Sequence, residues 1–134
     1  MSETKREILP LKASSDVVLA RQKVRQWAIE LRFTLVDQTK LVTAASELGR
    51  NTFDHGKGGS MTIEQLGVAG RVGLRLTFED QGPGIPDVEM ALKDGFTTGG
   101  GMGLGLGGSK RLVNEFSIES APGKGTRVTV VRWK

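Results

Sequence analysis

Apolar residues recur at two different spacings along the chain, and the change between them separates a helical part from a strand-rich part. From residue 14 to residue 31, and again from about residue 37 to residue 48, apolar side chains return every three or four positions. This spacing predicts two amphipathic helices that each bury one face. Before them, residues 7–11 predict a short edge strand, which tolerates Pro10 because an edge strand need not donate every N–H.

Polar residues and glycines mark where the two helices should begin and end. Ser14 or Ser15 can cap the first helix, because a serine hydroxyl accepts a hydrogen bond from an exposed N–H group of the first turn. Gly56, Gly58 and Gly59 should end the second helix. We therefore expect both helices to precede the first long strand.

After the second helix, apolar side chains alternate with polar ones. Residues 61–65 and 72–78 alternate on either side of the segment 67–70, which carries glycine at both ends. This pattern predicts a β-hairpin whose second strand ends at Asp80. Asp80 is therefore expected on a turn, directly after a buried strand.

The last third of the chain predicts a helix and a second hairpin. A short helical turn is expected over 86–93, and a later helix should carry Leu106, Leu112 and Val113. Residues 116–119 and 127–131 then alternate around a turn rich in glycine and proline. Helices followed by hairpin-connected strands predict a two-layer α/β sandwich, with a mixed, mostly antiparallel sheet and helices on one face.

Length and composition narrow the class of protein. The chain has 134 residues, of which 37% are apolar, so we expect one domain spanning 1–134 with a single core. There is no cysteine, and the start of the sequence contains no apolar signal core. No apolar run approaches the roughly 20 residues of a membrane helix. These features predict a cytoplasmic protein without a membrane segment.

The charge balance gives little support to nucleic-acid binding. Nineteen basic and fifteen acidic side chains give a net charge of +4 and a pI of about 9.7. The basic residues are spread along the chain, and only two Trp and no Tyr could stack on bases. We therefore expect no nucleic-acid partner.

Asp80-Gln81-Gly82-Pro83-Gly84-Ile85, followed by the glycine-rich run at 99–108, predicts a nucleotide site. A carboxylate on a turn can accept hydrogen bonds from an exocyclic amine such as that of adenine. Backbone without side chains lets bases and phosphates approach main-chain N–H groups.

Glu47 and Asn51 add a second pair of oxygen donors. They are four residues apart, so both side chains project from the same face of the second predicted helix. A carboxylate beside an amide oxygen suits Mg²⁺ and a water or hydroxyl group. Taken alone, a pair at this spacing more often belongs to a solvated polar face.

The glycine-rich run also fits other motifs. Residues 103–108 satisfy G-x-G-x-x-G, but no buried strand precedes them and no second half of a dinucleotide-binding domain follows. A structural glycine hinge remains an alternative. His55 suits a helix end better than a phosphoacceptor role, and Lys110 and Arg111 could neutralise phosphate or face solvent.

In chain order, the Glu47 and Asn51 pair, the motif that begins at Asp80 and the glycine-rich run resemble the N, G1 and G2 boxes of the GHKL ATPase and kinase superfamily. The ATP-binding domain of this superfamily has the Bergerat fold. The resemblance covers about residues 40–130. Within that superfamily the chain resembles the anti-sigma-factor serine/threonine kinases, and most of all the RsbT-type switch kinases of bacterial stress signalling. The closer match is carried by four phrases: Ser46-Glu47-Leu48-x-Arg50-Asn51, Asp80-Gln81-Gly82-Pro83-Gly84-Ile85-Pro86-Asp87, Asp94-Gly95-Phe96-x-Thr98 and Lys110-Arg111-Leu112.

The resemblance implies a role for each matching residue. Asp80 would bind the adenine amine of ATP, Asn51 would coordinate Mg²⁺, and Glu47 would be the catalytic base for a hydroxyl acceptor. Thr126 would support adenine near Asp80. The remaining cofactor-binding residues would line the base pocket or form a lid over the phosphates: Gly82, Gly84, Ile85, Thr97, Thr98, Gly101, Met102, Gly103, Leu104 and Gly105.

The same resemblance implies partners. The substrate would be a serine or threonine on a small STAS-domain antagonist, and a second partner would be a phosphatase or a sigma-factor branch protein; a homodimer is a further expectation. Two alternatives stay open: the ATP-binding domain of a sensor histidine kinase, and a nucleotide-controlled binding module with little turnover. Glu47 favours transfer to a hydroxyl, because histidine kinases usually carry Asn at this position.

Overall fold

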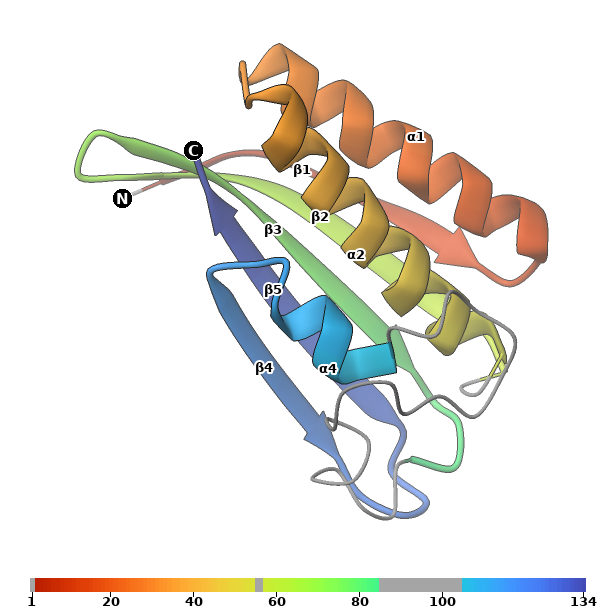
Figure 1. Ribbon diagram of the computed structural model, residues 1–134. Helices are drawn as coiled ribbons and strands as arrows, with labels where there is room; N and C mark the ends of the chain where they lie inside the picture. Colours follow the sequence, from red (N-terminus) through yellow and green to blue (C-terminus); the bar gives the residue numbers. More distant parts are fainter. Residues whose placement is uncertain (1, 55–56, 85–104) are drawn as a thin grey trace.

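The computed structural model describes residues 2–54, 57–84 and 105–134 (Figure 1). Three helices and five strands lie within these ranges. In chain order they are β1 (Ser2–Leu11), α1 (Ser14–Glu30), α2 (Leu35–Asp54), β2 (Gly59–Val68), β3 (Arg71–Asp80), α4 (Gly105–Lys110), β4 (Glu115–Ser120) and β5 (Thr126–Trp133). In these parts of the chain, no helix is both long enough and apolar enough to cross a membrane.

The five strands form one sheet in the order β1-β2-β3-β5-β4. All four strand pairings are antiparallel. Figure 1 shows the three helices on the same side of this sheet. The predicted two-layer α/β sandwich is confirmed, and the strand pairs seen are antiparallel without exception.

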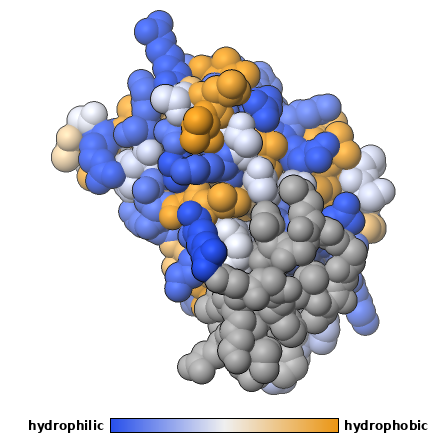
Figure 2. Space-filling view, in the orientation of Figure 1, coloured by the Kyte–Doolittle hydropathy of each residue, from blue (hydrophilic) through white to orange (hydrophobic). Residues whose placement is uncertain are grey.

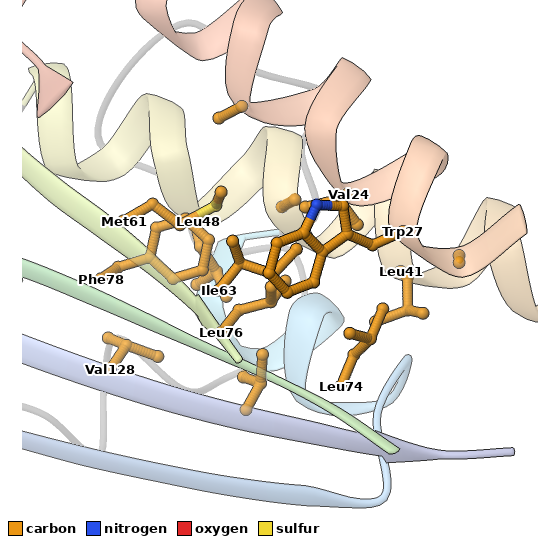
Figure 3. Packing of buried hydrophobic residues seen from close by; sticks show 14 of the residues in the cluster. Val24, Trp27, Leu41, Leu48, Met61, Ile63, Leu74, Leu76, Phe78 and Val128 are labelled. Carbon is orange, nitrogen blue, oxygen red and sulfur yellow. The ribbon is translucent and has the colours of Figure 1, made fainter. Parts of the chain in front are cut away.

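The core lies between the helices and the inner face of the sheet (Figure 3). Helix α1 contributes Val24 and Trp27, and α2 contributes Leu41 and Leu48. The strands contribute alternate residues, because side chains along a strand point to opposite faces. The buried members from the sheet include Met61, Ile63, Leu74, Leu76, Phe78, Val128 and Val130, none more than 4% exposed. The alternation predicted for the first hairpin therefore points its apolar residues into this core.

Both predicted hairpins are present. Strands β2 and β3 are joined by Ala69 and Gly70, whose φ values of 52° and 79° are those of a tight turn with two left-handed residues. Strand β1 is an edge strand, as predicted, and it is longer than expected. Strands β4 and β5 form the second hairpin.

Two predicted helix ends need correction. Neither Ser14 nor Ser15 caps α1: Ala13 is the N-cap, and Asp16 Oδ2 accepts from the N–H groups of Lys12 (2.8 Å) and Ala13 (3.0 Å). The Asp16 carboxylate thus binds the backbone N–H groups at the entrance to the helix, and the hydrogen bond to a first-turn N–H that was predicted for serine is not made. The last helix, α4, ends at Lys110, so Leu112 and Val113 follow it rather than belonging to it. The helical turn predicted over 86–93 lies outside the described residues.

The surface of the helical side is mainly polar, with apolar residues scattered among charged ones (Figure 2). A group of exposed apolar side chains lies at the end of the molecule where α1 meets α2. There Ile29 is 54%, Leu35 70% and Val36 62% exposed. The helices are therefore amphipathic over most of their length, as their periodicity predicts. At the junction between α1 and α2 the solvent-facing side is more apolar.

Candidate functional site

Asp80 is the last residue of β3, the central strand of the sheet. Its neighbours across the strands are Gly59 on β2 and Thr126 on β5. Asp80 is two positions after Phe78, whose buried side chain belongs to the core, so both side chains point to the face that carries the helices. The sheet therefore presents the Asp80 carboxylate at the end of its apolar inner face.

Hydrogen bonds hold the Asp80 carboxylate in place. Its Oδ1 accepts the backbone N–H of Gly82 at 2.9 Å, and the backbone amide of Thr126 also donates to it. Burial raises the pKa of Asp80 above the ordinary value of 3.8, and the two backbone hydrogen bonds oppose this rise. A carboxylate with this environment is desolvated and still offers further lone pairs to a ligand.

The loop after Asp80 and the β4–β5 turn touch through their backbones. The N–H of Gly123 donates to the carbonyl of Pro83 at 2.7 Å. Gly84 and Gly125 have φ values of 80° and 75°, in the left-handed region that glycine favours. A Cβ at Gly84 would overlap the carbonyl of Ala121, and one at Gly125 would overlap the carbonyl of Asp80. These glycines therefore let two main chains meet directly beside the carboxylate.

Glu47 and Asn51 lie one turn apart on α2. The side of this helix that carries Gly49 packs on the core: a Cβ there would lie 3.5 Å from Val17 on α1 and 3.9 Å from Phe78 on β3. Glu47 and Asn51 are each two residues, about 200°, from Gly49, so both lie on the opposite side of the helix. This segment of α2 crosses β3 two residues before Asp80. Glu47 is only 2% exposed, whereas Asn51 is partly exposed.

The Glu47 and Asn51 side chains suit a divalent cation that is shared with phosphates. A carboxylate and an amide oxygen are both hard oxygen donors, the type that Mg²⁺ prefers. Asn51 would supply one of the six ligands that Mg²⁺ requires, phosphate oxygens and water would supply the rest, and the Glu47 carboxylate would face a water or hydroxyl group beside the ion. The donor set therefore fits Mg²⁺ bound together with a nucleotide.

The structure brings together part of the predicted site. Asp80, Gly82, Gly84 and Thr126 lie side by side, and the helix segment with Glu47 and Asn51 crosses the same strand. Gly105 is the first residue of α4, which contacts α2. The predicted lid and pocket residues Ile85, Thr97, Thr98, Gly101, Met102, Gly103 and Leu104 lie outside the described residues, as does His55.

Two residues that sequence reasoning missed belong to the surroundings of Asp80. Gly59, expected only to end the second helix, lets β2 pass against the backbone of Glu79 and Asp80, where a Cβ would overlap the Glu79 carbonyl. Ser120 is the cross-strand partner of Thr126, and its hydroxyl lies 2.9 Å from the Thr126 hydroxyl. The hairpin register around the turn at 122–125 was the signal that could have identified Ser120.

A second aspartate, Asp37, lies at the start of α2 and pairs with an arginine. Its Oδ1 accepts from Arg132 Nη2 at 2.6 Å, and Arg132 Nη1 donates to the carbonyl of Leu112 at 3.0 Å. The hydrogen bond from Arg132 lowers the pKa of Asp37 below 3.8. Arg132 thus ties α2 and the segment after α4 to β5.

The fold and the arrangement around Asp80 define a class of nucleotide-binding protein, and comparison with known families agrees. Residues 36–134 match the family described as histidine kinase-, DNA gyrase B- and HSP90-like ATPase. The chain belongs to this family, which confirms the GHKL resemblance seen in the sequence boxes.

Relatives narrow the class further. The chain is 48% identical over 118 residues to the serine/threonine-protein kinase RsbT of Bacillus subtilis (strain 168), covering 88% of this chain and 89% of that protein. It is 33% identical over 131 residues to the anti-sigma F factor of Thermoanaerobacter sp. (strain X514), covering 92% and 89%. The chain therefore belongs, within the superfamily, to the family of RsbT-like serine/threonine kinases and anti-sigma factors.

A solved structure supports the fold alone. The crystal structure of the RsbU and RsbW domains of Rv1364c from Mycobacterium tuberculosis superposes with a TM-score of 0.61 at 20% identity. The match covers 98% of this chain and 33% of that longer chain.

Proposed function

We propose that this chain is an ATP-dependent protein serine/threonine kinase of the anti-sigma, stress-signalling type. The observation that carries the proposal is the position of Glu47, a buried carboxylate one helical turn before Asn51, on the helix that crosses the strand ending at Asp80. A carboxylate at this position can serve as a base for a hydroxyl acceptor.

The adenine end of ATP would bind at Asp80. The desolvated carboxylate accepts hydrogen bonds, and the exocyclic amine of adenine donates them. Thr126 is its cross-strand neighbour, and the backbone of Gly82 and Gly84 lies beside it. Asp80 would therefore select and orient the base, while the triphosphate would extend toward α2.

Transfer of the γ-phosphoryl group would use Glu47 and Asn51. The acceptor hydroxyl oxygen attacks the γ-phosphorus, its proton passes to Glu47, and the bond to the β-phosphate oxygen breaks to release ADP. Asn51 would hold Mg²⁺ through its amide oxygen; when bound, the ion neutralises phosphate charge. The burial of Glu47 would keep water from competing with the acceptor hydroxyl.

The names of the relatives support a protein partner of some kind, and the particular partners are our proposal. We propose a serine or threonine on a STAS-domain antagonist as the phosphate acceptor, and a phosphatase or sigma-factor branch protein as the second partner, in a cytoplasmic switch. The names of the anti-sigma F relatives support regulated binding of a partner as a second property of the same chain. A homodimer remains a prediction.

Replacement of Glu47 tests the kinase proposal. Glu47→Gln keeps the shape of the side chain and removes the base, so transfer of radiolabelled phosphate from ATP to a STAS-domain protein of the same cell should fall by about 10²- to 10⁴-fold. Calorimetry should show nearly unchanged ATP affinity. Glu119→Gln, on the exposed outer face of β4, is the matched control and should retain full transfer.

Two results would count against the proposal. Full transfer by the Glu47→Gln variant would remove Glu47 as the base. Transfer to a histidine side chain instead of a hydroxyl, recognised by the acid lability of the phosphate, would favour the histidine-kinase alternative.

A further inference from the structure

Four residues form a row across the inner face of the sheet at its Asp80 end. Gly59, Asp80, Thr126 and Ser120 are successive cross-strand partners on β2, β3, β5 and β4. Partners on one face have Cβ atoms about 4.5–5.5 Å apart. Thr126 therefore stands between the carboxylate of Asp80 and the hydroxyl of Ser120.

The hydrogen bond between the two hydroxyl groups in this row has a defined direction, with one group as donor and the other as acceptor. Ser120 Oγ donates to the carbonyl of Gly125 at 2.9 Å, and it lies 2.9 Å from Thr126 Oγ1. A hydroxyl carries one proton, and that of Ser120 is used by Gly125. Thr126 must therefore donate in the second hydrogen bond. Its hydroxyl then has only lone pairs left, so toward a ligand it acts as an acceptor.

The backbone fixes the group that receives the Ser120 proton. Gly125 has a φ of 75°, and its Cα is so close to the carbonyl of Asp80 that a Cβ would overlap it. The Gly125 carbonyl therefore cannot easily turn away from Ser120. Any further partner of the Ser120 oxygen has to donate to it, which leaves the polarity of Thr126 unchanged.

We propose that Ser120 is a positioning residue that makes Thr126 a hydrogen-bond acceptor and thereby helps the site to select a 6-amino purine. The inference rests on the proposed binding of adenine at Asp80. Asp80 and Thr126 would then present acceptors side by side, matching an amino group that has two protons. A 6-oxo purine has an oxygen at this position, which neither acceptor can satisfy.

Nucleotide selectivity tests the inference more directly than affinity does. Calorimetry would measure Kd for ATP, for inosine triphosphate, which has a 6-oxo group, and for purine riboside triphosphate, which has hydrogen at position 6. In the Ser120→Ala variant the Thr126 proton is released and can turn toward the ligand. The ratio of Kd for inosine triphosphate to Kd for ATP should fall by about tenfold, the effect of one hydrogen bond.

Three controls separate the effect of the Thr126 hydrogen-bond direction from a general disturbance of the site. Ser120→Thr keeps the hydroxyl and should retain the wild-type ratio. Ser117→Ala removes a hydroxyl from the exposed outer face of the same strand and should also retain it. Purine riboside triphosphate should bind the wild-type protein and Ser120→Ala equally, because it has no polar group at position 6.

The outcomes distinguish this inference from the proposed function. A wild-type protein that binds no ATP would overturn both. A wild-type protein that prefers ATP, with the same preference in Ser120→Ala, would overturn only the role of Ser120. If circular dichroism shows that Ser120→Ala is unfolded, Thr126→Val, which removes the acceptor with nearly the same shape, should lower the ratio similarly; an unchanged ratio would likewise overturn the inference.

Discussion

Asp37 and Asp80 are partly buried aspartates at opposite ends of the sheet, and their surroundings shift their pKa values in opposite directions. Arg132, which pairs with Asp37, is six residues along β5 from Thr126, the neighbour of Asp80, a separation of about 20 Å. The pKa of Asp37 is lowered, mainly by its hydrogen bond from Arg132, and that of Asp80 is raised by burial.

The difference is the one expected between a structural carboxylate and a carboxylate that binds a ligand, the role we propose for Asp80. Asp37 faces a guanidinium, so its charge is compensated within the fold. Among the described residues, the partners of the Asp80 carboxylate are the backbone amides of Gly82 and Thr126, which donate hydrogen bonds but carry no compensating charge. Burial that raises a carboxylate pKa destabilises the charged form, and such an arrangement is characteristic of binding sites. Three substitutions and a change of pH would break or sharpen this comparison.

The largest expected effect is the loss of ATP affinity when Asp80 is replaced. Asp80→Asn presents an amide donor where the carboxylate accepted, and a hydrogen bond to a charged group is worth about 1.5–3 kcal/mol. We expect ATP affinity, measured by calorimetry, to fall by about 100-fold with little change in the thermal unfolding temperature. Unchanged affinity would remove Asp80 from the nucleotide site.

Replacement of the other aspartate should instead affect folding. Asp37→Asn leaves the guanidinium of Arg132, whose side chain is 15% exposed, without its counter-charge. The free energy of unfolding, from urea titration, should fall by about 2 kcal/mol while ATP affinity is retained. Glu7→Gln, which breaks the more exposed pair with Lys23, is the matched control and should change stability by less than about 1 kcal/mol. Equal losses of unfolding free energy in the two variants would show that burial of the Arg132–Asp37 pair adds nothing to stability.

The two aspartates should also respond differently to acid. Protonation places a hydrogen on the Asp80 carboxyl, which is then a poorer acceptor for the adenine amine, so ATP affinity should decline as the pH falls through the raised pKa of Asp80, by about tenfold one unit below it. The stabilisation from Asp37 is present above 3.8 and is lost only as the pH falls through its lowered pKa. A range of pH should therefore exist in which the protein is folded and binds ATP weakly. Asp80→Asn, which cannot titrate, separates this effect from ionisation of the phosphates.

The smallest expected effect is a gain in stability. Gly49→Ala places a Cβ at ordinary contact distance from Val17 and Phe78, and alanine favours the helix over glycine by about 1 kcal/mol. Urea titration should show that gain, with ATP affinity unchanged, because Glu47 and Asn51 are on the other side of α2. A loss of stability would contradict the packing of α2 on β3.

Much of the fold could be predicted from the sequence, because local patterns determine it. The spacing of apolar residues in α1 and α2 and the alternation in β2 and β3 both follow from one face packing on a core. Helix ends were less predictable. The N-cap of α1 depends on the orientation of Asp16, and α4 ends before Leu112, whose carbonyl accepts from the distant Arg132.

The candidate site was predictable where a motif is local. Asp80 with Gly82 and Gly84 is such a motif, and so is Glu47 with Asn51, since a helix sets their relation. Gly59 and Ser120 could not be identified in this way. Their importance comes from strand register, which places residues from four strands in one row. Long-range register becomes certain only when the whole sheet is known.

The contacts at Gly59, Gly84 and Gly125 have a consequence for how this protein can diverge. Because main chain contacts main chain at these points, the position of the Asp80 carboxylate does not depend on which side chains surround it. The residues on the outer surfaces of these loops can therefore be exchanged without moving the carboxylate. A single methyl group at any of the three crossings would have the opposite effect, since it would push the two backbones apart.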